Sequence, residues 1–184
     1  DLTAPVVTHS INGMPGASGW YASDVTLTFT ATDPDTPVTT TGCATQTVSA
    51  TTSVDGVTFT CVATSAGGET TDAVTIKLDK TIPTISGAVT SGTLGVNAWY
   101  TSDVGITWTP SAAGPSGQTP SSDCGTVALT SDTPGYTFSC TVTSGADIAS
   151  PPGTVTVKRD ATNPVVTYAG KKLFNETCAK CHTL

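Results

Sequence analysis

"GWYASDVTLTFT" at residues 19–30 returns as "AWYTSDVGITWT" at residues 98–109, and this pair predicts the architecture of the chain. In the first copy Val25, Leu27 and Phe29 alternate with threonines, so one face of the segment is apolar and the other is polar. The apolar positions of the second copy are Val104, Ile106 and Trp108. An alternation of period two is typical of a β-strand with one face in a core and the other in water.

Other stretches recur at the same interval. The segment "DLTAPVVT" (1–8) returns as "DKTIPTIS" (79–86) and again as "DATNPVVT" (160–167), and "GVTFTCVATS" (56–65) returns as "GYTFSCTVTS" (135–144). A repeat of about eighty residues indicates tandem domains. We therefore predict an all-β chain of two tandem antiparallel β-sandwiches, at residues 1–79 and 80–160, because Gly, Pro, Asp and Ser clusters separate short strand-like runs.

The six cysteines point to disulfides and an oxidising compartment. Four of them repeat in register, which favours the pairs Cys43–Cys61 and Cys124–Cys140, one in each domain. Each bridge closes a short loop and contributes about 3 kcal/mol in the chain-entropy model. Zinc binding by these four is disfavoured, because their spacing lacks the short C-x-x-C steps of zinc sites.

Charge and hydropathy exclude several classes of protein. The net charge is −7 with only 11% charged residues, so the surface repels nucleic acid and anionic membranes. No apolar run approaches the roughly 20 residues of a transmembrane helix. The chain begins at Asp1 and no signal peptide is visible, so we expect a mature or excised piece of a longer protein. An extracellular, cell-surface or periplasmic location is expected from the disulfides.

The repeated motifs D-x-T-x-P, W-Y-x-S-D-V and T-F-[TS]-C resemble those of bacterial extracellular immunoglobulin-like repeats. The resemblance covers residues 1–160 and implies immunoglobulin-like sandwiches on a secreted or surface protein, without implying an activity. The chain departs from antibody-type domains, because each cysteine pair spans too little chain to be their inter-sheet bridge.

Polar and aromatic positions within the repeats favour structural roles. The pairs Ser23-Asp24 and Ser102-Asp103 are expected to cap turns. Trp20-Tyr21 and Trp99-Tyr100 are expected to pack at the core or edge rather than to stack on sugars. A calcium site at Asp33 and Asp35 is disfavoured, since the second copy has no acid there, and the junction residues Asp1, Asp79 and Asp160 are expected to form ordinary hinge turns rather than to hold calcium. No catalytic constellation emerges, so we do not expect an enzyme.

The C-terminal run "GKKLFNETCAKCHTL" (170–184) carries the spacing C-x-x-C-H, the attachment signature of c-type haem. In that chemistry Cys178 and Cys181 form thioethers with the haem vinyl groups, and His182 is the proximal ligand of the iron. The flanking G-x-x-L-F resembles the amino-terminal helix of a class I cytochrome c, which implies a helical haem-attachment segment within residues 161–184.

Three interpretations of this run remain. It starts a cytochrome domain that is truncated here, or it binds haem with a sixth ligand from another subunit, or Cys178 and Cys181 form a third disulfide. His9 and Met14 are the other residues of the usual axial-ligand types.

The sequence supports two functions. The first is an extracellular or periplasmic electron-transfer protein whose β-domains position or assemble covalent haem c, with a redox protein or a neighbouring cytochrome as partner. Lys171, Lys172 and Lys180 would steer acidic partners toward it. The alternative is a structural, adhesive or filament-forming surface protein whose β-domains mediate self-assembly or bind a surface partner.

Overall fold

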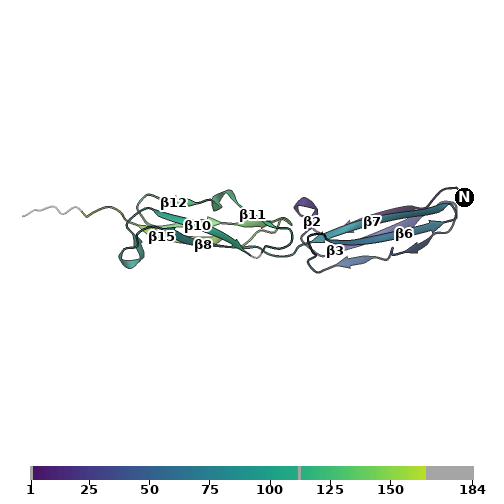
Figure 1. The fold of residues 1–184 in the computed structure, drawn as a ribbon, viewed down its shortest axis with the longest axis horizontal. Helices are drawn as coiled ribbons and strands as arrows, with labels where there is room; N and C mark the ends of the chain where they lie inside the picture. Colours follow the sequence, from purple (N-terminus) through teal and green to yellow (C-terminus); the bar gives the residue numbers. More distant parts are fainter. Residues whose placement is uncertain (1, 112, 165–184) are drawn as a thin grey trace, which may run out of the picture.

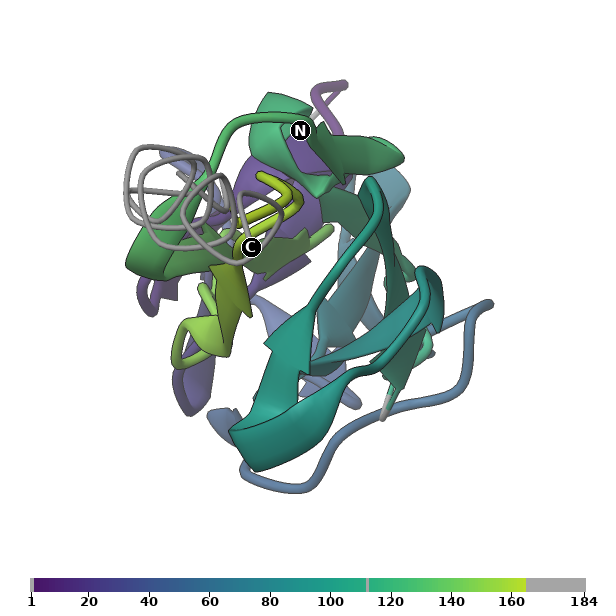
Figure 2. The ribbon, with the colours of Figure 1, turned by 90° about the vertical axis from the view of Figure 1, so that its left-hand side faces the viewer.

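The computed structural model describes residues 2–111 and 113–164, which form two β-modules lying end to end (Figure 1). Viewed along the long axis, the two modules overlap in projection, as an end-to-end arrangement requires (Figure 2). The predicted helical segment at 165–184 lies outside the described residues, whereas residues 161–164 are described and have no regular secondary structure. In the part of the chain that is described, no helix has the length and apolar character to span a bilayer.

The N-terminal module contains strands β1 to β7. They are β1 (Val6–Asn12), β2 (Trp20–Tyr21), β3 (Val25–Thr32), β4 (Thr39–Thr41), β5 (Gln46–Val48), β6 (Val57–Ser65) and β7 (Gly68–Leu78), with the short 3-10 turn η1 (Ala17–Gly19) before β2. One sheet has the order β1-β3-β5 and the other β2-β7-β6-β4. All pairings are antiparallel except that of β2 with β7, which is parallel.

The C-terminal module repeats this plan. Its elements are β8 (Thr84–Ser91), η2 (Val96–Ala98), β9 (Trp99–Tyr100), β10 (Val104–Ser111), β11 (Gln118–Pro120), η3 (Ser122–Cys124), β12 (Val127–Leu129), β13 (Thr133–Cys140), β14 (Val142–Ser144) and β15 (Gly153–Arg159). The β12-β10-β8 sheet faces β13-β15-β9, and β11 pairs with β14. The parallel pair β9–β15 corresponds to β2–β7.

Each module has its own core between its two sheets. In the N-terminal module Val25 and Leu27 of β3 pack with Cys61 of β6 and Ile76 of β7, all with no exposed surface. The second core consists of Val104, Ile106, Trp108, Leu129, Cys140 and Val157. The alternation predicted from the sequence is therefore confirmed, and so is the fold class of two tandem antiparallel β-sandwiches.

Both predicted disulfides, Cys43–Cys61 and Cys124–Cys140, are present. The first lies within one sheet rather than between the sheets, because Cys43 follows β4 and β4 pairs with β6. The bridge therefore fastens the short β4 region to the long β6 strand, as the small loop predicted.

The buried face does not extend to the starts of β6 and β13. Val57 and Tyr136 lie there and alternate in register with Cys61 and Cys140, which are buried further along the same strands. Val57 and Tyr136 are 41% and 52% exposed. The strand β5 of the opposing sheet has only three residues and does not cover this end, so Val57 and Phe59 line an open hollow beside residues 47–52.

Candidate functional site

The predicted haem ligands Cys178, Cys181 and His182 lie outside the described residues. Within residues 2–111 and 113–164 there is no group of three or more His, Cys, Asp or Glu side chains arranged to hold a metal ion. Two other places in the described chain have buried polar side chains close to the end of a module. They are the joint between the modules and the free end of the C-terminal module.

Asp79 is the centre of the joint. It directly follows β7, its backbone N–H donates to the Tyr21 carbonyl at 3.0 Å, and its side chain is fully buried. One carboxylate oxygen accepts from the Thr81 N–H at 2.9 Å. The other accepts from both the N–H and the hydroxyl of Ser116, at 3.1 and 2.5 Å. Because Ser116 belongs to the C-terminal module, this carboxylate links the two modules directly.

Two opposing effects act on the pKa of Asp79. Burial raises it, since a charged carboxylate loses hydration. The hydrogen bonds from Ser116 and Thr81 favour the ionised form and together hold the pKa below its ordinary value of 3.8. The carboxylate is therefore charged at neutral pH, and it is the acceptor that these donors require.

Close backbone contacts surround this link. A side chain at Gly114 would collide with the Asp79 carboxylate, and one at Gly16 would collide with the backbone of Ala146. Gly16 lies just before η1 in the N-terminal module, and Ala146 is a fully buried residue of the C-terminal module. Figure 1 shows η1 reaching toward the neighbouring module at this point. The contact of Gly114 with Asp79 and that of Gly16 with Ala146 therefore both hold the two modules together at the joint.

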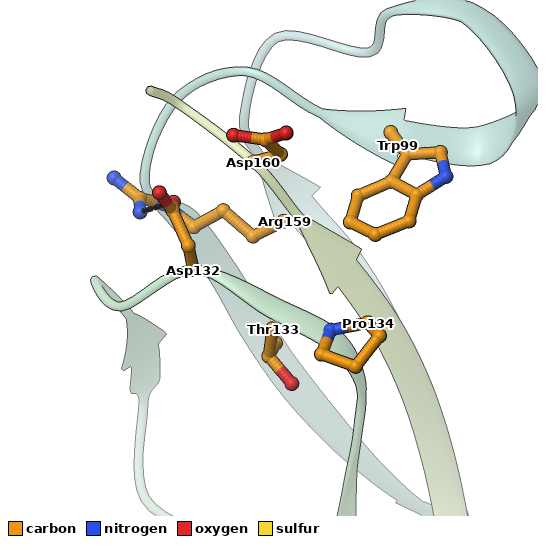
Figure 3. Close-up of a pocket in the computed structure, with 6 residues that line it drawn as sticks. All are labelled: Trp99, Asp132, Thr133, Pro134, Arg159 and Asp160. Atoms are coloured by element: carbon orange, nitrogen blue, oxygen red, sulfur yellow. Dashed lines mark hydrogen bonds and ion pairs between the residues drawn. The ribbon is translucent and has the colours of Figure 1, made fainter.

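The free end of the C-terminal module has a pocket of about 280 Å³. It is lined by Trp99, Asp132, Thr133, Pro134, Arg159 and Asp160. Figure 3 shows the ring of Trp99 on one side of this pocket and the side chains of Asp132 and Arg159 on the other.

Arg159 is held in a network of carboxylates at this end. Its guanidinium contacts Asp132 at 2.5 Å and Asp103 at 2.7 Å, and its Nε donates to the Ser102 carbonyl at 3.1 Å. Asp132 also accepts from the Thr162 hydroxyl at 2.6 Å and the Ala161 N–H at 2.9 Å. The bonds from Thr162 and Ala161, together with the charge of Arg159, hold the pKa of Asp132 below its ordinary value.

The backbone-bonding roles predicted for Ser23 and Ser102 are confirmed, although each hydroxyl bonds to a residue nine positions earlier. The Ser23 hydroxyl accepts from the Met14 N–H at 2.8 Å, and the Ser102 hydroxyl accepts from the Thr93 N–H at the same distance. Asp24 and Asp103 form ion pairs with Lys80 and Arg159 rather than capping turns. The packing role predicted for Trp20 is also confirmed, because the residue is 6% exposed and the Lys77 ammonium lies 5.8 Å from the centre of its ring.

The prediction of an ordinary hinge turn at Asp79 is wrong. Asp79 is buried and bonded across the joint, because a hydroxyl of the next module lies where a hinge residue would meet water. The recurrence of Asp at 79 and 160 was visible in the sequence. Its partner was not, because Ser116 lies in a loop where the two repeats differ in length and composition.

Asp33 and Asp35 form a local turn in the structure. One Asp33 carboxylate oxygen accepts from the Asp35 N–H at 2.9 Å and from the Thr36 N–H at 3.1 Å. These bonds hold the pKa of Asp33 below its ordinary value, the Asp35 N–H contributing most. This geometry accounts for the D-x-D sequence through turn chemistry.

Comparison with known proteins adds little to this picture. No family model matches the chain, and no curated protein matches it. Among solved structures, the fibronectin(III)-like modules of Clostridium thermocellum CbhA match at 16% identity, over 89% of this chain and all of that one, with a TM-score of 0.32. Domains A168–A170 of titin match at 13% identity, over 85% of this chain and 65% of that one, with a TM-score of 0.28. Likeness at this level carries no argument, and the fold rests on the strand pairing and the two cores.

Proposed function

We propose that the two β-modules are a stiff structural spacer in an extracellular, cell-surface or periplasmic protein. The observation that carries this proposal is the buried Asp79 link, because a carboxylate bonded to both modules limits bending between them. The two disulfides suit an oxidising compartment. The proposal assigns no chemical reaction to the modules. Their function in it is self-assembly or attachment to a surface partner.

Deletion of residues 168–184 tests this proposal in cells that produce the protein. If the β-modules carry the function, surface attachment or filament assembly persists in the deletion strain at the level of the parent. A matched strain with Asp79→Ala keeps the tail but weakens the joint, so we expect reduced attachment or assembly there. Loss of function in the deletion strain, with normal function in the Asp79→Ala strain, would contradict the spacer role.

A second function, electron transfer through covalent haem c, is favoured by the C-x-x-C-H spacing of Cys178, Cys181 and His182. The donor set fits this group, because two thiols separated by two residues add to the vinyl groups and the adjacent imidazole binds iron. When bound, the haem supplies one-electron redox chemistry. In this proposal the β-modules position the haem-binding segment, and Lys171, Lys172 and Lys180 attract an acidic redox partner.

A pyridine haemochrome spectrum of the chain, expressed together with a c-type haem maturation system, tests this second function. We expect the absorption of a haem joined by two thioethers, surviving denaturation and acid–acetone extraction. The Cys178→Ala/Cys181→Ala variant is the control and should lose the covalent haem while both modules remain folded. A colourless wild-type protein under these conditions rules out haem attachment.

A further inference from the structure

We propose that the free end of the C-terminal module is a docking surface for residues 165–184 of the same chain. We define this end surface as Leu94, Val96, Trp99, Pro134 and Asp160. The proposal goes beyond the spacer role, and it holds whether or not the segment carries haem. The internal repeat makes this end equivalent to the corresponding end of the N-terminal module, which is joined to a neighbour, whereas this one is exposed.

Asp160 repeats the position of Asp79, but its carboxylate accepts one hydrogen bond within the described residues where that of Asp79 accepts three. Its N–H donates to the Tyr100 carbonyl at 2.9 Å, as that of Asp79 donates to the Tyr21 carbonyl. One Asp160 oxygen accepts from the Thr162 N–H at 3.1 Å, as one Asp79 oxygen accepts from Thr81. At Asp79 the remaining oxygen accepts from Ser116, whereas no donor for the remaining oxygen of Asp160 is found in residues 2–111 and 113–164.

The apolar surroundings differ in the same way. At the joint, Trp20 is buried and Gly16 lies against Ala146 of the next module. At the free end, the equivalent Trp99 is partly exposed. The loop that corresponds to Gly16 and its neighbours carries Leu94 and Val96, which are 61% and 80% exposed. Two large apolar side chains beside an uncovered tryptophan indicate a surface that is normally covered.

The lead-in prolines support the same conclusion. Pro5 and Pro83 each precede the first strand of a module, and both are fully buried. Pro164 occupies the same place in the third lead-in and is exposed among the described residues. In the register of the repeat, the chain after Pro164 therefore has the sequence position of a third module.

Residues 165–184 are the occupant best placed to cover this surface. Asp132 holds Ala161 and Thr162 at the rim of the pocket, so the segment begins beside the surface and its effective concentration there is high. The segment supplies apolar Leu173 and Phe174. A second copy of the chain would have to bring its own residues 2–5 to a place where residues 161–164 already lie.

Its charge also fits the end surface. Three carboxylates, from Asp103, Asp132 and Asp160, lie at this end with the cations Lys158 and Arg159, a net charge of −1. Residues 165–184 contain Lys171, Lys172, Lys180 and one glutamate, so their side chains carry a net charge of +2. Opposite signs favour this contact over one between two acidic β-modules.

The test compares the full chain with its Leu94→Ser/Val96→Ser variant, in the form isolated from the producing cells. The readouts are the rate of trypsin cleavage after Lys171 and Lys172, and the amide NMR signals of residues 94–99. Cleavage follows the open population, so the double variant should be cut about tenfold faster if the wild-type segment is docked about nine-tenths of the time. The control is Leu2→Ser, which changes an exposed leucine at the opposite end and should leave both readouts unchanged.

Two results would overturn the proposal. One is equal cleavage of the wild-type and double-variant chains at the rate of a free peptide of the same sequence, with both chains folded by circular dichroism. The other is a wild-type spectrum in which the signals of residues 94–99 shift with protein concentration, since a second copy would then be the occupant.

Discussion

At the scale of single residues, the two modules form equivalent turns with different residues at the same position. Gly19 and Ala98 end the equivalent turns η1 and η2, and both have a positive φ, 78° and 60°. Glycine adopts this left-handed region without steric cost, whereas alanine does not. The C-terminal module therefore carries backbone strain that the N-terminal module avoids.

We expect Ala98→Gly to stabilise the C-terminal module by about 0.5–1 kcal/mol. The change relieves the strain of a left-handed alanine, and the greater flexibility of glycine in the unfolded chain offsets part of that gain. The reciprocal Gly19→Ala should destabilise the N-terminal module by a similar amount. A Cβ at Gly19 meets no atom within 4 Å, so this change tests backbone strain alone. Urea unfolding of both variants measures the difference, and a destabilised Ala98→Gly protein would contradict this account.

The Asp79 carboxylate makes the free energy of unfolding depend on pH under acidic conditions. Its folded pKa lies below the unfolded value, so the ionised carboxylate stabilises the folded chain above about pH 4. That contribution is lost as the pH falls through the folded pKa, because the protonated group is a poorer acceptor for Ser116 and Thr81. The free energy of unfolding should therefore fall less steeply below pH 4 in Asp79→Asn than in the wild type.

Urea titrations at several pH values between about 2 and 6 measure this slope across the range in which carboxylates titrate. Asp55→Asn, an exposed carboxylate in the turn before β6, is the matched control and should follow the wild type. If the free energy of unfolding falls with the same slope below pH 4 in the wild type and in Asp79→Asn, the Asp79 carboxylate does not contribute to stability.

At the scale of elements, the strand alternation determines which side chains carry the stability. Ile106 on β10 has no exposed surface, whereas its neighbour Thr107 faces outward and shares a 3.0 Å hydroxyl contact with Thr90. Ile106→Ala should destabilise the C-terminal module by about 2–5 kcal/mol, from lost burial and the cavity left behind. Thr107→Ala should cost less than about 1 kcal/mol, because only a cross-strand pair at the surface is lost. Thermal unfolding of the two variants measures this difference, and a larger loss in Thr107→Ala than in Ile106→Ala would mean that β10 faces the opposite way.

The repeat made these strands and the two disulfides predictable, because each landmark occurred twice at one interval. The exposed ends of β6 and β13 were not predictable in the same way. Alternation says which residues share a face, but the length of the opposing strand decides whether that face is covered. Val57 and Tyr136 have the parity of the buried face, but they are exposed because the opposing strand is too short to cover them.

The joint was only half predictable, for a related reason. A recurring Asp marks a position that both modules use, and the sequence indicated that much. The donor of its hydrogen bonds comes from a loop 37 residues later, where the repeat is irregular. Pairings across a module boundary therefore need the three-dimensional structure, as do the exposures of Leu94 and Val96 at the free end.

At the scale of the whole molecule, the joint decides whether the two modules move as one body. Three hydrogen bonds converge on the Asp79 carboxylate, two of them from the C-terminal module, and backbone contacts at Gly16 and Gly114 leave little space for rotation. Each hydrogen bond to a charged acceptor contributes about 1.5–3 kcal/mol to stability. A bend that separates Ser116 from Asp79 is therefore opposed by an energy well above thermal energy.

We expect residual dipolar couplings from both modules of the wild-type chain to fit a single alignment tensor. In Asp79→Ala the N–H and hydroxyl of Ser116 lose their acceptor, so the modules should reorient separately and require two tensors of different magnitude. Ser116→Ala, which keeps the N–H bond, should give an intermediate result. Asp160→Ala is the matched control, because it removes the equivalent carboxylate from the end that joins no described module. Two tensors in the wild type would contradict the stiff spacer, because the modules would then reorient independently. A single tensor in Asp79→Ala, with both modules folded, would mean that contacts other than this carboxylate, such as that of Gly16 with Ala146, set the orientation.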